Sequence, residues 1–263
     1  MTMMASVFYS AGKLILGFAL LLVLGACGDA SDGSSGNSES GSVSGSKAKI
    51  IKMDGVIYSL ADQRLVRVDI SDPANPTITD DVDAGWAAET LTHDGEAIYV
   101  GSPQEVRTYG YHPDTGLQFI DTSLPRRATS DPVITDGEYA YSTVVTRSGT
   151  DTEGRAWGEG DLYVYEVDAE KNLTEINVMT GIGFVQGLTL WNDHLFICDP
   201  VSGLLQLNVT DPMLIETVHQ MDFVQCEDIL HLGEGHFATV GEQGIYQLVP
   251  YNENKLAVIS IYN

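Results

Sequence analysis

The sequence predicts an all-β fold, a five-bladed β-propeller built from four-stranded antiparallel blades over residues 47–263. Three observations predict it. Tight-turn pairs, of which Asp54-Gly55 is the first, recur before short apolar strands. The first residues of the five pairs are spaced by 40, 42, 56 and 42 positions, which matches the length of a propeller blade. Apart from the apolar run at 14–24, no stretch shows helical periodicity.

Within each unit, the turn pair separates a first strand from a second, and two more strands follow. The third strand of the first unit, at 65–70, alternates between the two faces as a strand does. Asp72-Pro73 then ends that strand, because proline cannot continue a β-ladder. The fourth strand begins at Thr77, and the fourth unit has equivalent strands at 204–209 and 215–219.

Chain length agrees with five such units. They need about 210 residues, while residues 47–263 number 217 and the third unit is longer by 14. A β-sandwich is the alternative, since it also has short strands with turns about every 8–12 residues, but the regular recurrence favours the propeller. Because each unit contains its own first and last strand, we expect no strand exchange between the chain ends.

Residues 1–26 are predicted to be a signal peptide and not part of the fold. Lys13 precedes the apolar run at 14–24, whose eleven residues are too few for a bilayer span of about 20. The run leads into Leu24-Gly25-Ala26-Cys27, which resembles the lipobox of bacterial lipoproteins. The resemblance implies cleavage before Cys27 and attachment of lipid to its thiol. The alternative is a secretory signal followed by a chance cysteine.

Residues 27–46 are predicted to be a lipidated Ser/Gly-rich tether, a flexible coil that holds the domain away from the lipid. The residue after Cys27 is Gly28 and not Asp. By resemblance to the sorting pattern of Gram-negative lipoproteins, this favours the outer membrane. We therefore expect an exported protein, anchored to the cell envelope, whose first partner is the membrane itself.

The charge balance limits the classes of partner. The chain has 13 Lys and Arg residues against 37 Asp and Glu, a formal net charge of −24. We expect no nucleic-acid partner, because such binding depends on clustered basic residues that release counterions. The acidity is compatible with a divalent cation, but the acidic run at 80–85 lacks the third ligand and distal glutamate of a calcium loop. No cofactor, metal site or catalytic residue is assigned, since no motif indicates one.

Two third-strand segments carry a family resemblance. LVRVDISDPANP at 65–76 and LLQLNVTDPMLI at 204–215 resemble the LVIVD repeat of bacterial and archaeal surface propellers. The match is strong in the first unit and eroded in the second, third and fifth. The resemblance implies a secreted or surface-attached β-propeller, and it implies no reaction and no catalytic residues.

Acidic residues precede or begin the first strands of three units. In a propeller these starts lie around the mouth of the central channel, on the same face as the connections between second and third strands. The starts hold Glu89, Asp131 and the pair Glu227-Asp228. A ring of carboxylates there could bind a cation or perform general acid/base chemistry. The alternative is a set of solvated channel-lining acids in a chain that is acidic throughout.

The third unit carries an insertion between its second strand, near Thr143, and its third strand, near Asp161. It brings Arg147, Arg155 and Trp157 to the face of the channel mouth, where Trp86 also lies. Tryptophan and arginine are enriched among interface hot spots. We therefore predict that this face binds a partner. The alternative is an extended hairpin whose tryptophan folds back on its own blade.

Two cysteines remain beyond Cys27. Cys198 ends the second strand of the fourth unit and Cys226 begins the first strand of the fifth, so a disulfide would link neighbouring blades. An exported location permits it, and closing the loop would stabilise the fold by roughly 3 kcal/mol. The alternative is two separate buried thiols that pack as small apolar side chains.

Together these features predict a binding or scaffold module for a protein or glycan partner at the cell envelope. The alternative is a propeller hydrolase of the glycosidase or lactonase type, using carboxylates at the channel mouth. The two differ in geometry, since an enzyme needs two or three carboxylates converging within about 5–10 Å in a concave pocket.

Overall fold

The computed structural model describes residues 47–126, 132–154, 156–252 and 255–262. The predicted signal peptide, the tether and Cys27 lie outside the described residues, and so do Asp131 and Arg155. Over the described ranges the fold is all-β, and no helix long and apolar enough to cross a membrane is found there.

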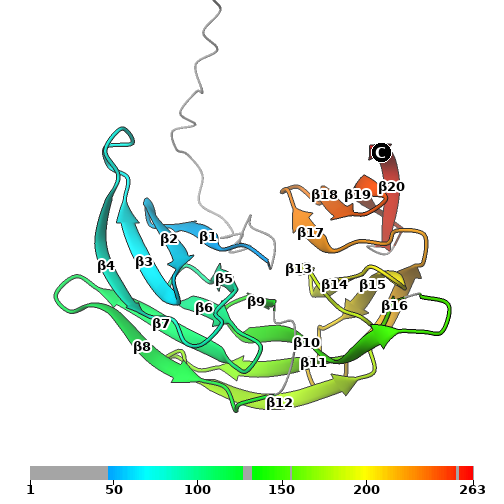
Figure 1. Cartoon of the computed structure of the whole chain (residues 1–263), viewed down its shortest axis with the longest axis horizontal. Coiled ribbons are helices and arrows are strands. Elements are labelled where there is room, and N and C mark those ends of the chain that lie inside the picture. Colours follow the sequence, from blue (N-terminus) through cyan, green and yellow to red (C-terminus); the bar gives the residue numbers. More distant parts are fainter. Residues whose placement is uncertain (1–46, 127–131, 155, 253–254, 263) are drawn as a thin grey trace, which may run out of the picture. The chain divides into compact units, whose positions relative to one another are not determined.

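Twenty strands in the described residues form five sets of four consecutive strands, which we call blades 1 to 5 (Figure 1). Blade 1 is β1 (Ile50–Met53), β2 (Val56–Ala61), β3 (Arg64–Asp69) and β4 (Thr77–Asp83). Blade 2 is β5 (Thr90–His93), β6 (Ile98–Gly101), β7 (Val106–His112) and β8 (Gly116–Thr122). Blade 3 is β9 (Val133–Thr135), β10 (Tyr139–Thr150), β11 (Ala156–Val167) and β12 (Leu173–Thr180). Blade 4 is β13 (Leu188–Trp191), β14 (His194–Asp199), β15 (Gly203–Asn208) and β16 (Glu216–Met221). Blade 5 is β17 (Asp228–His231), β18 (Phe237–Gly241), β19 (Gly244–Tyr251) and β20 (Lys255–Tyr262).

Every blade is an antiparallel meander in which each strand pairs with the next one along the chain. The first strands β1, β5, β9, β13 and β17 are the inner ones, and consecutive blades touch through them (Figure 1). The prediction of four-stranded antiparallel sheets in a propeller-like arrangement is confirmed, and no sheet contains a strand taken from another unit.

The predicted turn pairs join first and second strands by two kinds of turn. Asp54 and Gly55 both have positive φ, at 51° and 76°, as a two-residue hairpin of type I′ requires. In blade 2, Gly95 alone has positive φ, at 95°. There the Asp94 carboxylate accepts the N–H groups of Glu96 and Ala97 at 2.8 Å and so closes the turn with its side chain.

The hydrophobic core is divided among the spaces between neighbouring blades. Four clusters of buried side chains join blades 1 and 2, 2 and 3, 3 and 4, and 4 and 5. Each second strand supplies a fully buried aromatic ring. These rings are Tyr58, Tyr99, Tyr141, Phe196 and Phe237. None of the four clusters contains residues of both blade 5 and blade 1, so the described residues complete four of the five interfaces that a closed ring needs.

An ion pair adds a polar link between blades 2 and 3. The Lys171 ammonium lies 3.0 Å from the Asp94 carboxylate, whose side chain is almost fully buried. Burial alone would raise the pKa of Asp94, but hydrogen bonds from Ala97, Glu96, Tyr99 and Lys171 outweigh it and lower the pKa. The carboxylate therefore stays charged and holds the turn of one blade against the loop of the next.

A disulfide links blades 4 and 5. Cys198 lies in β14 and Cys226 in the segment before β17, with their Cα atoms 5.1 Å apart. Both residues are fully buried within the cluster between these blades. Of the two possibilities left open by the sequence, the structure contains the bridge.

We expect the bridge to stabilise the domain mainly by restricting the unfolded chain. A variant with Cys198→Ser and Cys226→Ser should lose about 3 kcal/mol of unfolding free energy, because 28 positions separate the cysteines. Urea denaturation with and without reductant measures this. Reductant should lower wild type to the level of the double variant and leave the variant unchanged. Equal midpoints for oxidised wild type and variant would contradict the prediction.

Candidate binding face

One face of the domain collects all the predicted site residues that the structure describes. It consists of the starts of the first strands, the turns between second and third strands, and the loops that join blades. We call it the top face. Hydrogen bonds tie these segments together. The Glu89 N–H donates to the Gly101 carbonyl at 2.9 Å, and the Gln225 amide donates to the Val201 carbonyl at 3.1 Å.

At the mouth of the channel, Lys47, which precedes β1, lies near acidic side chains from other blades. The Lys47 ammonium donates a 2.6 Å hydrogen bond to the Gln186 side chain, so blades 1 and 4 meet here. Burial lowers the pKa of Lys47, against the opposing charges of Asp228, Glu227 and Glu89. The three predicted acids that the structure describes thus lie close enough to the Lys47 ammonium for their charges to raise its pKa.

The pKa of Asp228 is strongly raised. Burial raises its pKa to about 6, although the Ile229 N–H and the Lys47 charge act to lower it. The carboxylate packs directly against Gly187 of the neighbouring blade, where a side chain would collide with it. Asp228 can therefore take up or release a proton near neutral pH, as a ligand or general acid would require.

Among the described residues, no group of three or more His, Cys, Asp or Glu side chains is placed so that it could hold a metal ion. The described side chains at the mouth are acids near one ammonium, which suits hydrogen bonding to hydroxyl groups or attraction of a cationic group.

The insertion of blade 3 continues the sheet and does not form a loose loop. β10 and β11 stay paired out to Thr150 and Ala156, with a register shift between Val145 and Arg147. The extension places Arg147 on the top face, 3.5 Å from the Glu159 carboxylate across the ladder. The two strands thus project a stiff hairpin from the top face.

Trp157 lies on this hairpin opposite Gly149. The indole covers its glycine partner so closely that a Cβ on Gly149 would lie 3.2 Å from it. Even so, 41% of Trp157 remains exposed. The residue therefore combines the two alternatives, since one side packs on its own hairpin and the other side faces solvent.

The loops between blades add an apolar rim that sequence reasoning largely missed. Trp86 is 61% exposed, Phe223 61% and Leu124 71%, and each lies in a different loop before a first strand. Trp86 was predicted for this face, whereas Phe223 and Leu124 were not. The sequence signal that could have identified Phe223 is its position relative to a first strand. Phe223 precedes β17 by five residues, much as Trp86 precedes β5 by four. Phe184, four before its strand, instead packs on Gly158 of the hairpin.

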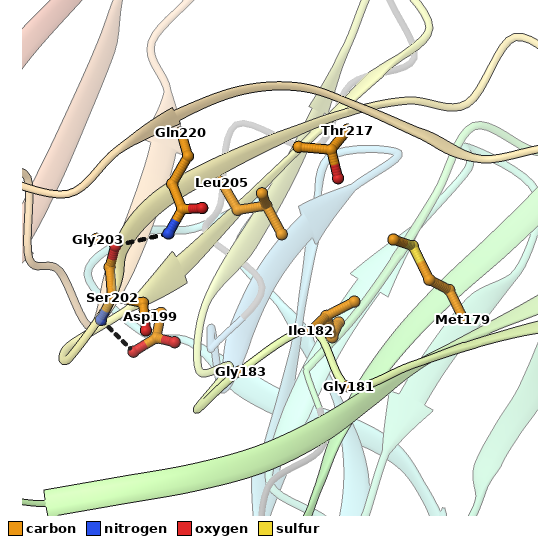
Figure 2. A pocket seen from close by; sticks show the side chains of 10 residues that line it. All are labelled: Met179, Gly181, Ile182, Gly183, Asp199, Ser202, Gly203, Leu205, Thr217 and Gln220. Atoms are coloured by element: carbon orange, nitrogen blue, oxygen red, sulfur yellow. Dashed lines mark hydrogen bonds between the residues drawn. The ribbon is translucent and has the colours of Figure 1, made fainter.

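A pocket of about 260 Å³ opens between blades 3 and 4 (Figure 2). Apolar side chains from Met179, Ile182 and Leu205 form one part of the wall. Asp199 has a structural role, because its carboxylate accepts hydrogen bonds from the N–H groups of Phe184 at 2.8 Å and Ser202 at 2.9 Å. The sequence offered no signal for this pocket, because its lining comes from three separate segments, at 179–183, 199–205 and 217–220. The lining residues are Met179, Gly181, Ile182, Gly183, Asp199, Ser202, Gly203, Leu205, Thr217 and Gln220.

Comparison with known proteins identifies a fold and no family. No protein-family model matches the chain, and no curated protein matches it. A solved protein from Lactobacillus plantarum is similar with a TM-score of 0.57 at 13% identity, over 80% of this chain and 68% of that chain. A functionally unknown protein from Desulfotomaculum acetoxidans DSM 771 is similar with a TM-score of 0.56 at 12% identity, over the same shares. A periplasmic gluconolactonase from Pseudomonas aeruginosa reaches a TM-score of 0.41 at 12% identity, over 78% of this chain and 81% of that chain.

The two neighbours with TM-scores above 0.5 share the fold described above. At such low identity the similarity concerns the fold alone. The resemblance to the LVIVD repeat stays a prediction, since no family model supports it.

The perturbed pKa of Asp228 predicts a pH-dependent stability. A raised pKa in the fold means that the contribution of Asp228 is present at low pH and is lost as the pH rises through about 6. Asn does not titrate, so Asp228→Asn should gain stability over wild type by about 1 kcal/mol more at pH 8 than at pH 5. Urea denaturation at both pH values measures the difference. A gain of equal size at both would show that Asp228 titrates normally.

Proposed function

We propose that this protein is an exported, lipid-anchored binding module whose top face recognises a protein or glycan partner at the cell envelope. The observation that carries the proposal is the rim of exposed apolar side chains around an acidic mouth, all on one face. Trp86, Phe223 and Leu124 are each more than half exposed there. Exposed apolar surface gathered on one face marks interaction sites, whereas scattered residues do not.

The hairpin of blade 3 supports the same face. Trp157 offers a half-exposed indole held on a stiff ladder, and Arg147 adds a guanidinium that is mostly exposed. An indole that is already positioned loses little entropy when a partner covers it. Aromatic rings of this kind stack on sugar rings or fill apolar pockets of a protein, which are the two partner classes proposed.

The negative charge of the top face restricts the chemical class of the partner further. The mouth holds Glu89, Glu227 and Asp228 against one lysine, within a chain of net charge −24. Such a surface attracts cationic or hydroxyl-rich groups and repels polyanions. This supports a partner other than nucleic acid.

The position of Lys47 relates the top face to the proposed anchor. Lys47 lies at the channel mouth and directly follows the predicted tether at 27–46. A flexible tether of that length has an end-to-end distance of about 25 Å. If Cys27 carries the lipid, the top face works close to the membrane surface, where an envelope partner would be met.

A hydrolase remains the second candidate, and one observation favours it. Asp228, with a pKa of about 6, lies near Lys47 and Glu227, and perturbed groups of this kind cluster at catalytic sites. Asp228→Asn separates the candidates. A hydrolase acting on a saccharide or lactone would lose turnover, whereas a binding module would keep capturing its partner through the rim.

Substitution of the rim tests the binding function. Envelope fractions and glycan arrays are probed with the full chain and with Trp86→Ala, Phe223→Ala and a deletion of residues 148–159. Each change should lower affinity at least tenfold, because each removes a large contact from the face. Met213→Ala is the matched control, since Met213 is 60% exposed in a loop on the opposite face. Its affinity should stay within twofold of wild type. If the two rim substitutions and the hairpin deletion all bound the partner as wild type does, the proposed face would be refuted.

Cys27→Ser tests the anchor separately. The serine hydroxyl cannot replace the thiol that receives the lipid, so the variant should be released from membranes or remain unprocessed. Membrane fractionation and mass spectrometry of the N-terminus measure this. Recovery of normally processed, membrane-bound C27S protein would overturn the anchoring proposal and leave the binding face untouched.

A further inference from the structure

The pocket between blades 3 and 4 has an apolar interior at the outer margin of the top face. Met179 lies near the end of β12, Ile182 in the loop after it, and Leu205 in β15. Figure 2 shows Met179 and Ile182 on one side of the space and Leu205 on the other, with Thr217 at its edge. Ile182 belongs to the core cluster between these blades, and the other two apolar side chains pack against that cluster. The walls of the pocket are therefore already in place without a ligand.

The polar groups that line the pocket offer a ligand no free charge. Asp199 is the one charged residue among the described lining residues. Its Oδ1 accepts the N–H groups of Val201 and Ser202 at 2.7 and 2.9 Å. Its Oδ2 accepts the N–H group of Phe184 at 2.8 Å. The Gln220 amide donates to the Ser202 carbonyl at 3.0 Å, so the polar edge of the pocket is neutral.

The interior suits an apolar side chain better than a sugar ring. A cavity of about 150 Å³ lined by aliphatic and phenyl groups holds a benzene molecule, and this pocket measures about 260 Å³. No aromatic ring is present among the described lining residues, so a sugar has no ring to stack on. Hydroxyl groups pressed against Met179, Ile182 and Leu205 would lose their hydrogen bonds to water without replacement.

Exposed apolar side chains border the pocket on the top face. Val201 is 38% exposed in the turn that lines the pocket, and Phe223 is 61% exposed in the loop after β16. The Gln225 amide donates to the Val201 carbonyl at 3.1 Å, and a Cβ on Gly203 would collide with the Met221 carbonyl. The loop is therefore held against the turn. A pocket flanked in this way is typical of interface hot spots, where one inserted side chain is surrounded by contacts that exclude water.

The rest of the mature chain offers no large apolar side chain that could fill the pocket. After the predicted cleavage and lipidation at Cys27, the largest apolar residue outside the described parts is Val43, and serines flank it. The ranges compared are 28–46, 127–131, 155, 253–254 and 263. The occupant that fits the pocket therefore comes from another molecule.

We propose that this pocket receives one apolar side chain of a protein partner, of the size of leucine, methionine or phenylalanine. The partner chain on either side of that residue lies against Val201 and Phe223. The inference rests on the proposed binding function of the top face, and it decides between the two partner classes in favour of a protein. Residues next to the inserted side chain should be neutral or basic, because the chain has a net charge of −24.

NMR of the full chain in detergent, labelled with ¹³C at the methionine methyl groups, tests the pocket directly. Met179 reports on the pocket, and Met213, which is 60% exposed outside it, is the internal control. The probes are N-acetyl-leucinamide, which carries an apolar side chain on a peptide backbone, and methyl glucoside. The leucine probe should shift the Met179 signal saturably at millimolar concentration, as expected for so small a ligand. Met213 should not respond, and methyl glucoside should shift neither signal.

The Met179→Leu variant identifies the Met179 signal by its loss. No shift of this signal with the leucine probe would overturn the inference, and so would an equal or stronger response to methyl glucoside. This titration uses wild type and therefore does not depend on the folding of any further variant.

Blocking the pocket gives a second measurement. Thr217→Phe places a ring at the edge of the pocket and should weaken binding of the leucine probe by about tenfold or more. Thr174→Phe is the matched control, because Thr174 is an exposed threonine of an outer strand that does not line the pocket. Its response should equal that of wild type. Equal binding by both variants would show that the probe binds elsewhere.

Two further outcomes separate this inference from the proposed function. If light scattering showed a dimer that Thr217→Phe dissociates, the occupant would be a second copy of the chain and not a different protein. If a glycan bound and Trp86→Ala weakened it while Thr217→Phe did not, the proposed binding face would stand. The assignment of the pocket to a protein side chain would then be wrong.

Discussion

Burial of one apolar blade face against the next blade is the interaction that holds the five blades together. Each blade places a fully buried aromatic ring from its second strand against a neighbouring sheet. Burial of one such ring contributes about 2–3 kcal/mol, and an isolated sheet would leave much of that surface in water. Stacking is therefore what makes each repeat fold, and the polar links between blades only secure contacts that apolar burial has already formed.

Stacking also creates the candidate site. Because the first strands converge, Lys47, Glu89 and Asp228 from three blades come close enough to influence one another. The lowered pKa of Lys47 and the raised pKa of Asp228 arise mainly from desolvation at this meeting point and from no property of the local sequence. The strands fix the blades, so the connections on the top face are free to carry function. That freedom explains why large apolar side chains stay exposed in loops that join so rigid a set of sheets.

The same burial that builds the internal interfaces leaves the two end blades incomplete. A repeated unit supplies a complementary pair of faces at every junction, but the first and last units each keep one face without a neighbour among the described residues. On blade 1 the outward face combines the apolar Ile78 with the ion pair of Arg64 and Asp81. This face is therefore partly polar, as the outer face of a terminal repeat in such arrays ordinarily is.

The sequence by itself determined the local features: the five turn pairs, the four strands of each unit and the absence of exchanged strands. These follow from short-range rules, because turn chemistry and side-chain alternation are set by adjacent residues. It also placed Glu89, Glu227, Asp228 and the hairpin on one face, since strand order fixes the ends of a meander. Three further features came from the tertiary structure: the Cys198–Cys226 bridge, the Lys47–Gln186 contact and the exposure of Phe223. Each of these depends on the angle and distance between sheets, and those quantities arise from packing over many residues that no local pattern encodes.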